Sequence, residues 1–268
     1  MFIDTHSHIY EEEFREDRDA TVQRALEANV KYIILPDIDS ESRGRMLDLE
    51  KQFPGIMFPL VGLHPTSVHE NYREELAQVE KHLGTHPFYG IGECGIDLYW
   101  DKSTYKEQVK AFEHQLGLAK DMNFPIIVHS RDSLTEILQI LKKHPYVRGI
   151  LHCFPGNEEE AVLACEMGFL LGIGGVVTFK NSIMAKAVQK VGIEHLVLET
   201  DSPYLAPVPY RGKRNESSYL PLIAAKVAEL TGEDIKKIET VTTQNAMNLF
   251  NLQLESHKGN ESFSGYLK

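Results

Sequence analysis

The middle of the chain reads PIIVHS at residues 125–130, SLTEILQILKK at residues 133–143 and RGILHCF at residues 148–154. The first and third segments are short and apolar, which is typical of buried strands, and the second has apolar residues at helical spacing. Near-continuous apolar strands that alternate with helices indicate a parallel sheet covered by helices. This unit therefore predicts two parallel strands joined by a helix.

Apolar runs of the same kind recur in both directions along the chain, separated by longer stretches. The runs occupy residues 1–8, 31–37, 56–64, 88–97, 125–130, 148–154, 169–174 and 196–201. Helical periodicity marks residues 104–122, 133–143, 219–230 and 233–250. Eight strand and helix units in about 250 residues match a closed α/β barrel, the (β/α)₈ or TIM type. A doubly wound open sheet is the alternative.

The chain shows no internal boundary. No linker rich in Pro, Gly and Ser divides it, and no short repeat is present. We therefore expect one TIM-barrel domain over residues 1–254. Residues 255–268 are polar, with scattered Gly, Ser and Asn, and are expected to form a frayed C-terminal tail.

Composition excludes several classes of protein. The 268 residues include 28 basic and 39 acidic side chains, for a net charge of −11, and 42% of them are hydrophobic. These values exclude a mostly disordered chain, a coiled coil and a collagen-like fibre. They also argue against a protein that coats nucleic acid through a broad basic surface, because such binding depends on neutralised phosphates. A local positive pocket remains compatible with this charge.

The compartment is predicted from cysteines and from missing signals. Cys94, Cys153 and Cys165 form no CxxC pair and are an odd number, as expected of free thiols under reducing conditions. The N-terminus has no basic segment followed by an apolar run, and no stretch approaches the roughly 20 apolar residues of a membrane helix. We expect a cytoplasmic protein without membrane contact and with no evident obligate protein partner.

The first apolar run contains the triplet His6-Ser7-His8. Side chains two residues apart on a strand point the same way, so both imidazoles can face the barrel lumen and bind one metal ion. Asp4 shares this face and could orient a histidine. Two histidines on one strand are a weak signal alone, since packing would also explain them.

Four further polar residues follow apolar strand segments. Glu93 ends FYGIGE, His129 ends PIIVH, His152 follows GIL, and Asp201 closes LVLETD. A charged or imidazole side chain at such a position is costly unless something satisfies it. All of them fall at the C-terminal ends of the predicted strands, where barrel enzymes have their active sites. Together with the two N-terminal histidines, they predict a metal site.

Six candidate ligands exceed the three or four that one catalytic zinc takes from a protein. We expect two divalent ions, one held by His6, His8 and Asp201 and the other by His129 and His152, with Glu93 between them. Two ions about 3.5–4 Å apart can activate a water and stabilise a displacement at phosphorus. The donor set suits Zn, Mn, Co or Ni and also admits Mg, and the sequence does not choose among them.

Two residues at the same end are candidates for catalysis. His64, in GLHP, follows the third apolar run; it would donate a proton or contact a phosphate, or simply close the turn before Pro65. Glu199 shares a strand face with Asp201. It is a catalytic carboxylate, a partner that orients a metal ligand, or a buried carboxylate paired with a bound ion or with His64.

Substrate phosphates would need basic residues near this end. The candidates are Arg131, which follows His129, and a loop after the eighth run that includes Arg211, Lys213, Arg214 and Asn215. Barrel phosphate sites often use the last strand-to-helix loops. A solvated loop is the alternative for these residues. Tyr99 and Trp100 could stack on a base, or pack in the core or at the rim.

Seven motifs in order resemble the TatD-type metal-dependent deoxyribonucleases of the amidohydrolase-like barrels. They are FIDTHSH, GLHP, IGECGID, PIIVHSR, GILHCFPG, LETDSPYLAP and RGKRNE, and the resemblance covers essentially the whole chain except the tail. The chain departs from the family pattern in two places: Ser217 stands where a proline commonly follows the glutamate, and Cys94 stands where an aliphatic residue is usual.

The resemblance implies a TIM-type barrel, a divalent-metal centre and hydrolysis of DNA phosphodiesters, in several members from the 3′ end. It places metal ligands at His6, His8, Glu93, His129, His152 and Asp201. We therefore expect a nuclease acting on DNA ends or single strands. In this hypothesis Asp201 orients or deprotonates the water, His64 contacts the phosphate or protonates the leaving oxygen, and Arg131 with the basic loop holds neighbouring phosphates.

Two other functions stay open. The first is hydrolysis of a lactone, a cyclic amide or a small phosphoester on the same barrel. Several relatives of that kind bridge their metals through a carboxylated lysine at the fourth strand, where this chain has Glu93 and no lysine. The second is a barrel without activity that binds metal or a partner; such a chain would usually have lost a ligand.

Overall fold

The computed structural model describes residues 1–253 and contains eight short parallel strands in chain order. They are β1 (Phe2–Asp4), β2 (Val30–Leu35), β3 (Met57–Pro59), β4 (Ile91–Asp97), β5 (Ile126–Arg131), β6 (Gly149–Leu151), β7 (Phe169–Ile173) and β8 (Leu196–Leu198). Each strand pairs in parallel with the next within the groups β1–β3 and β4–β8. All eight predicted strands are confirmed, most of them shorter than the apolar runs.

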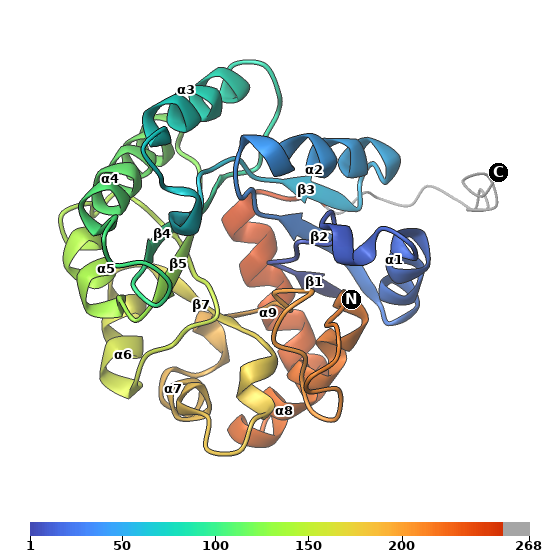
Figure 1. Ribbon diagram of the computed structural model, residues 1–268. Helices are drawn as coiled ribbons and strands as arrows, with labels where there is room; N and C mark the ends of the chain where they lie inside the picture. The colour runs from blue at the N-terminus through green and yellow to red at the C-terminus, as the bar shows by residue number, and fades with distance from the viewer. Residues whose placement is uncertain (254–268) are drawn as a thin grey trace.

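Backbone hydrogen bonds join the two groups of strands at both seams. Between β3 and β4, Val61 N donates to Gly90 O and Gly92 N donates to Val61 O. Between β8 and β1, Thr5 N donates to Leu198 O at 3.0 Å. The strands therefore close into a ring surrounded by helices, as Figure 1 shows. This is the predicted (β/α)₈ barrel, not the open sheet.

Eight helices follow the strands and cover the outside of the ring in the described part of the chain (Figure 1). They are α1 (Arg18–Glu27), α2 (Ser40–Gln52), α3 (Tyr72–Leu83), α4 (Tyr105–Met122), α5 (Leu134–Leu141), α6 (Glu158–Glu166), α7 (Ile183–Val191) and α8 (Leu220–Thr231). Side-chain caps begin two of them, Asp39 on α2 and Asn157 on α6. The periodicity of residues 104–122, 133–143 and 219–230 thus predicted α4, α5 and α8 to within a few residues.

The last helix, α9 (Ile235–Phe250), closes one end of the barrel. Its residues Met247 and Phe250 pack in one buried cluster with Ile3, Ile127 and Val197 from the strands. Thr243 Oγ1 also donates to Met1 O, directly before β1, which places α9 at the N-terminal ends of the strands. In Figure 1 this helix crosses the middle of the ring. The C-terminal ends of the strands therefore form the uncovered end.

Two other predictions concern the ends and the helices of the chain. The polar tail, residues 255–268, lies outside the described residues and stays a prediction. Within residues 1–253, no helix combines the length and apolar composition that a membrane span requires.

Candidate metal centre

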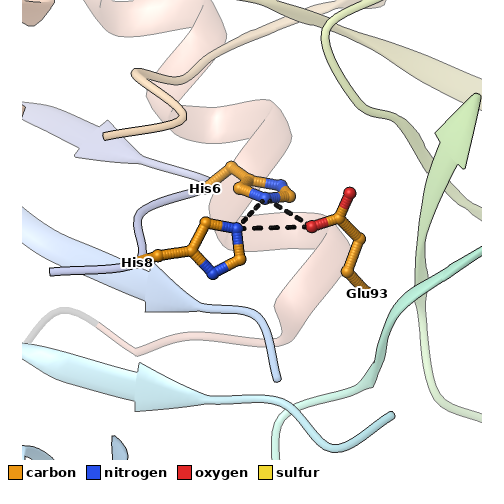
Figure 2. Close-up of side chains that lie close together, drawn as sticks. All are labelled: His6, His8 and Glu93. Carbon is orange, nitrogen blue, oxygen red and sulfur yellow. Dashed lines mark hydrogen bonds and ion pairs between the residues drawn. The ribbon is translucent and has the colours of Figure 1, made fainter. Parts of the chain in front are cut away.

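His6 and His8 lie just beyond β1, which ends at Asp4 rather than at residue 8 as the apolar run suggested. The chain stays extended there, because Thr5 N donates to Leu198 O on one side and Ser7 N to Ile34 O on the other. Both imidazoles consequently point the same way, and their Nε2 atoms lie 3.0 Å apart (Figure 2). Both residues are buried.

Glu93 approaches this pair from β4. It is the third residue of a strand that continues to Asp97, so the expectation that it ends the strand is wrong. Gly95 allows β4 to lie this close to β5, because a Cβ at residue 95 would lie 2.1 Å from the carbonyl oxygen of His129 on β5. Glu93 Oε2 lies 3.0 Å from His6 Nε2 and 3.4 Å from His8 Nε2 (Figure 2). Three atoms that could ligate one metal ion therefore converge.

The other oxygen of Glu93 faces a second group of imidazoles. Glu93 Oε1 lies 2.7 Å from His129 Nδ1, 3.4 Å from His64 Nε2 and 3.7 Å from His152 Nε2. In the described chain, the polar side-chain contacts of Glu93 are all with histidines. One carboxylate thus faces His6 and His8 with one oxygen and His129 with the other, while the ring of His152 stacks on that of His6 with centroids 3.7 Å apart. The assignment of these residues to two ions stays a prediction.

Asp201 faces both groups from the segment after β8. Its Oδ1 lies 3.8 Å from His6 Nε2 and 3.9 Å from His8 Nε2, while its Oδ2 lies 3.9 Å from His152 Nε2. These distances are too long for direct hydrogen bonds. Asp201 N donates to His6 O at 2.9 Å, which fixes the backbone of the two segments to each other. The six predicted ligands therefore meet in one buried cluster.

The charge of Glu93 depends on the histidines around it. Burial alone would raise the pKa of the Glu93 carboxyl, but His6, His64 and His152 outweigh burial and hold that pKa well below its usual range. Burial alone would lower the pKa of His152, but Glu199, Glu93 and Asp201 outweigh it and raise that pKa to about 10. These shifts in pKa favour an ionised Glu93 beside a protonated His152.

Burial shifts the pKa values of two other members of the cluster toward their neutral forms. Burial raises the pKa of Asp201 to about 7, although His152 and His8 oppose the shift. Burial also lowers the pKa of His6 well below its usual value, and His152 adds to this effect. A neutral imidazole offers a lone pair, and a metal binds carboxylates in the ionised form. The donor set, four imidazoles with two carboxylates, fits divalent transition metals.

Glu199 lies behind His152, away from the other ligands. Its Oε1 lies 3.0 Å from His152 Nδ1 and accepts a hydrogen bond from Cys153 N at 2.6 Å. Gly172 makes room for this buried side chain, because a Cβ there would lie 2.2 Å from Glu199 Oε2. Of the roles open for Glu199, the geometry favours that of a positioning partner, which turns His152 Nε2 toward Asp201 and Glu93.

We expect Glu199→Gln to lower metal affinity about 10- to 100-fold, because partners that orient a ligating histidine have effects of this size. Calorimetric titration of the metal-stripped variant with Mn²⁺ or Zn²⁺ would measure the loss. The matched control is Glu159→Gln on the exposed start of α6, which should bind metal like the wild type. Unchanged affinity in Glu199→Gln would remove its positioning role.

Two partners of the histidines escaped the sequence reasoning. Asp97 Oδ2 lies 3.0 Å from His129 Nε2, and the Tyr10 hydroxyl lies 2.8 Å from His8 Nδ1 while donating to Pro36 O. Since that hydroxyl gives its proton to Pro36, His8 Nδ1 donates to it, which leaves the His8 Nε2 lone pair free. Strand alternation could have found both, because Asp97 lies four residues from Glu93 and Tyr10 lies two from His8, and residues an even number apart share a face of an extended segment.

Asp4 does not have the role expected for it. Its carboxylate accepts hydrogen bonds from the backbone N–H of His6 at 3.2 Å and from Thr200 N and Thr200 Oγ1 at 2.9 and 2.6 Å. Burial raises the pKa of Asp4 to about 6, although these bonds oppose the shift. Asp4 therefore joins the segments that hold His6 and Asp201 instead of orienting an imidazole.

His64 reaches the second group of imidazoles. Its Nδ1 accepts from Thr66 N at 3.1 Å, so in the neutral ring Nε2 has the proton. That Nε2 lies 3.3 Å from His129 Nδ1 and 3.4 Å from Glu93 Oε1. Burial lowers the pKa of His64, although Glu93 opposes the shift. His64 is thus a neutral N–H donor at the edge of the cluster.

The predicted phosphate-binding residues have different surroundings. Arg131, Arg211 and Lys213 are exposed. Arg214 makes two hydrogen bonds of 2.7 Å to the carboxylate of Asp17, and the buried Asn215 donates to Thr200 O and Tyr204 O. The structure therefore uses Arg214 and Asn215 to hold the loop after β8. Within residues 1–253, the other three basic side chains have no such pairing.

A closed barrel with a buried His, Glu and Asp cluster at the C-terminal ends of its strands defines a class, the TIM-barrel hydrolases that depend on a metal. Comparison with known proteins agrees. The family model of the TatD related DNases matches residues 3–251. The chain belongs to this family of metal-dependent hydrolases.

Individual relatives support the same assignment. The metal-dependent hydrolase YabD of Bacillus subtilis is 37% identical over 255 residues, which cover 94% of this chain and 100% of YabD. The 3′-5′ ssDNA/RNA exonuclease TatD of Pectobacterium parmentieri is 30% identical over 250 residues, covering 90% of this chain and 95% of that protein. The crystal structure of the TatD homologue YjjV from Escherichia coli has a TM-score of 0.89 and 30% identity, covering 94% and 98% of the two chains.

Proposed function

We propose that this protein is a two-metal deoxyribonuclease that shortens DNA single strands or ends in the 3′ to 5′ direction. The proposal rests above all on Glu93, because one of its carboxylate oxygens faces His6 and His8 and the other faces His129 and His64. The name of the Pectobacterium relative, a 3′-5′ ssDNA/RNA exonuclease, supports the choice of substrate and polarity. The metals of choice are Mg, Mn or Zn, and Ni or Co could occupy the same ligands.

The side chains divide the work of hydrolysis among them. Divalent ions bound here would act as Lewis acids on the attacking water and on the phosphate oxygens of the substrate. Asp201, which faces both groups, orients that water and accepts its proton. His64 has its Nε2–H directed to the cluster and donates to the phosphate or to the leaving oxygen. Arg131, Arg211 and Lys213 bind neighbouring phosphates.

Metal-stripped protein incubated with 5′-labelled single-stranded DNA, with and without Mg²⁺, Mn²⁺ or Zn²⁺, tests this proposal. We expect a metal-dependent ladder that shortens from the 3′ end, resolved on a sequencing gel. The same sequence as RNA, included in parallel, reports the choice of sugar. Cleavage of lactones or small phosphoesters without cleavage of DNA would contradict the proposal, and so would absence of any hydrolysis. The cytoplasmic location expected from the sequence stays a prediction.

A further inference from the structure

Two large aromatic rings are exposed on the loop that follows β4. Tyr99 is 54% exposed and Trp100 is 69% exposed. The two rings meet edge to face, with centroids 4.9 Å apart and planes at 89°. Neither ring is therefore part of the core. Each ring keeps surface that a ligand can contact.

The guanidinium group of Arg131 lies against these rings. The Arg131 guanidinium carbon lies 3.7 Å from the centroid of the Tyr99 ring and 5.3 Å from that of Trp100. A guanidinium over an aromatic face is held there by the ring quadrupole and still has N–H donors at its edge. We call Tyr99, Trp100 and Arg131 the aromatic platform. It combines a flat apolar surface with a positive charge, on a chain whose net charge is −11.

The aromatic platform is connected to the candidate metal centre through one carboxylate. Asp97 Oδ1 accepts hydrogen bonds from the backbone N–H groups of Tyr99 and Trp100, at 2.9 and 3.2 Å. The other oxygen of Asp97 lies 3.0 Å from Nε2 of His129. Arg131 is the second residue after His129 on β5. The platform is thus fixed at the same end of the barrel as the cluster and beside one of its histidines.

We propose that the aromatic platform binds an unpaired nucleobase of a single-stranded oligonucleotide, next to the phosphodiester bond at the metal centre. This inference rests on the proposed function. Aromatic side chains stack on any base, because every base has a π-face, and Arg131 can pair with the adjacent phosphate. A base inside a duplex is already stacked and paired, so it cannot use the platform. The platform therefore selects single strands over duplexes.

Fluorescence tests this directly, because Trp100 is the only tryptophan in the chain. The metal-loaded protein is titrated with a short deoxyadenylate strand that has phosphorothioate linkages, which slow cleavage. The comparison strand has the same length and linkages but an abasic sugar at every position. Anisotropy of a 5′ label measures binding of each strand. We expect the deoxyadenylate to quench Trp100 and to bind about tenfold more tightly than the abasic strand.

Variants separate stacking from general attraction of anions. Trp100→Ala should weaken binding of deoxyadenylate about tenfold and leave the abasic strand unaffected. The matched control is Tyr146→Ala. Tyr146 is 78% exposed, and Lys120 Nζ lies 5.6 Å from the centroid of its ring. It precedes β6 and so lies at the opposite end of the barrel. Tyr146→Ala should bind both strands like the wild type.

Three results would overturn the inference: equal binding of the two strands, bound deoxyadenylate without a change in Trp100 fluorescence, or no binding of either strand. Failure of this inference and failure of the hydrolase proposal give different results. If deoxyadenylate quenches Trp100 but the same strand with ordinary phosphodiester linkages is not cleaved, the aromatic platform is supported and the nuclease is rejected. Cleavage of DNA with no response from Trp100 would do the reverse.

Discussion

Asp201→Asn is expected to lower kcat for DNA hydrolysis about 10²- to 10⁴-fold, the range associated with loss of a positioned proton acceptor. Asn has nearly the same shape as Asp but no negative charge, so it neither accepts the proton nor binds a metal ion as strongly. The barrel should remain folded. Burial raises the pKa of Asp201 to about 7, so the metal-free fold does not depend on its ionised form near neutral pH.

Single-turnover cleavage of a 5′-labelled strand measures the loss, and thermal unfolding of the metal-free protein checks the fold. The matched control is Asp132→Asn, because Asp132 is an exposed carboxylate in the turn after β5 at the same end of the barrel. The control should retain wild-type kcat. Near-normal turnover in Asp201→Asn would remove this carboxylate from the mechanism.

Glu93→Gln is expected to have the second large effect, on metal content as well as on rate. The Glu93 carboxylate contacts imidazoles on both sides, with Oε1 2.7 Å from His129 Nδ1 and Oε2 3.0 Å from His6 Nε2. A glutamine keeps one oxygen and presents an NH₂ group to the other side, where no acceptor for it remains once a metal is bound. We expect metal content to fall from two ions per chain to one or none, and activity to fall more than about 100-fold.

Elemental analysis after dialysis against limiting Mn²⁺ or Zn²⁺ measures the stoichiometry. Glu166→Gln, at the exposed end of α6, is the control for the loss of one carboxylate and should bind as many ions as the wild type. If Glu93→Gln retained two ions and normal activity, Glu93 would not connect the two groups of ligands.

The strands and the orientation of the first two histidines could be predicted from local sequence patterns. The apolar runs predicted all eight strands, because a strand buried on both faces needs apolar residues along its length. Alternation predicted that His6 and His8 would point the same way, although β1 itself ends at Asp4. The extended backbone beyond a strand obeys the same alternation as the strand, which is why this prediction did not need the correct boundary.

Contacts between segments that lie far apart in the sequence could not be predicted from it. Arg214 pairs with Asp17, which is 197 residues away, and Asn215 fills its hydrogen bonds with Thr200 and Tyr204. A basic loop looks the same in sequence whether its side chains are free or already paired. Asp97 was missed although it lies four residues from Glu93 on the same strand, because alternation alone does not show that its carboxylate contacts His129 and the backbone N–H groups after β4.

Titration of metal-stripped protein with Mn²⁺ or Zn²⁺, while cleavage of single-stranded DNA is followed at each addition, addresses the two-ion centre itself. If Glu93 connects two sites, activity should rise steeply only as the second equivalent binds and should reach its maximum at two ions per chain. Full activity at one equivalent would contradict the two-ion centre, even though the same six side chains would still surround the ion.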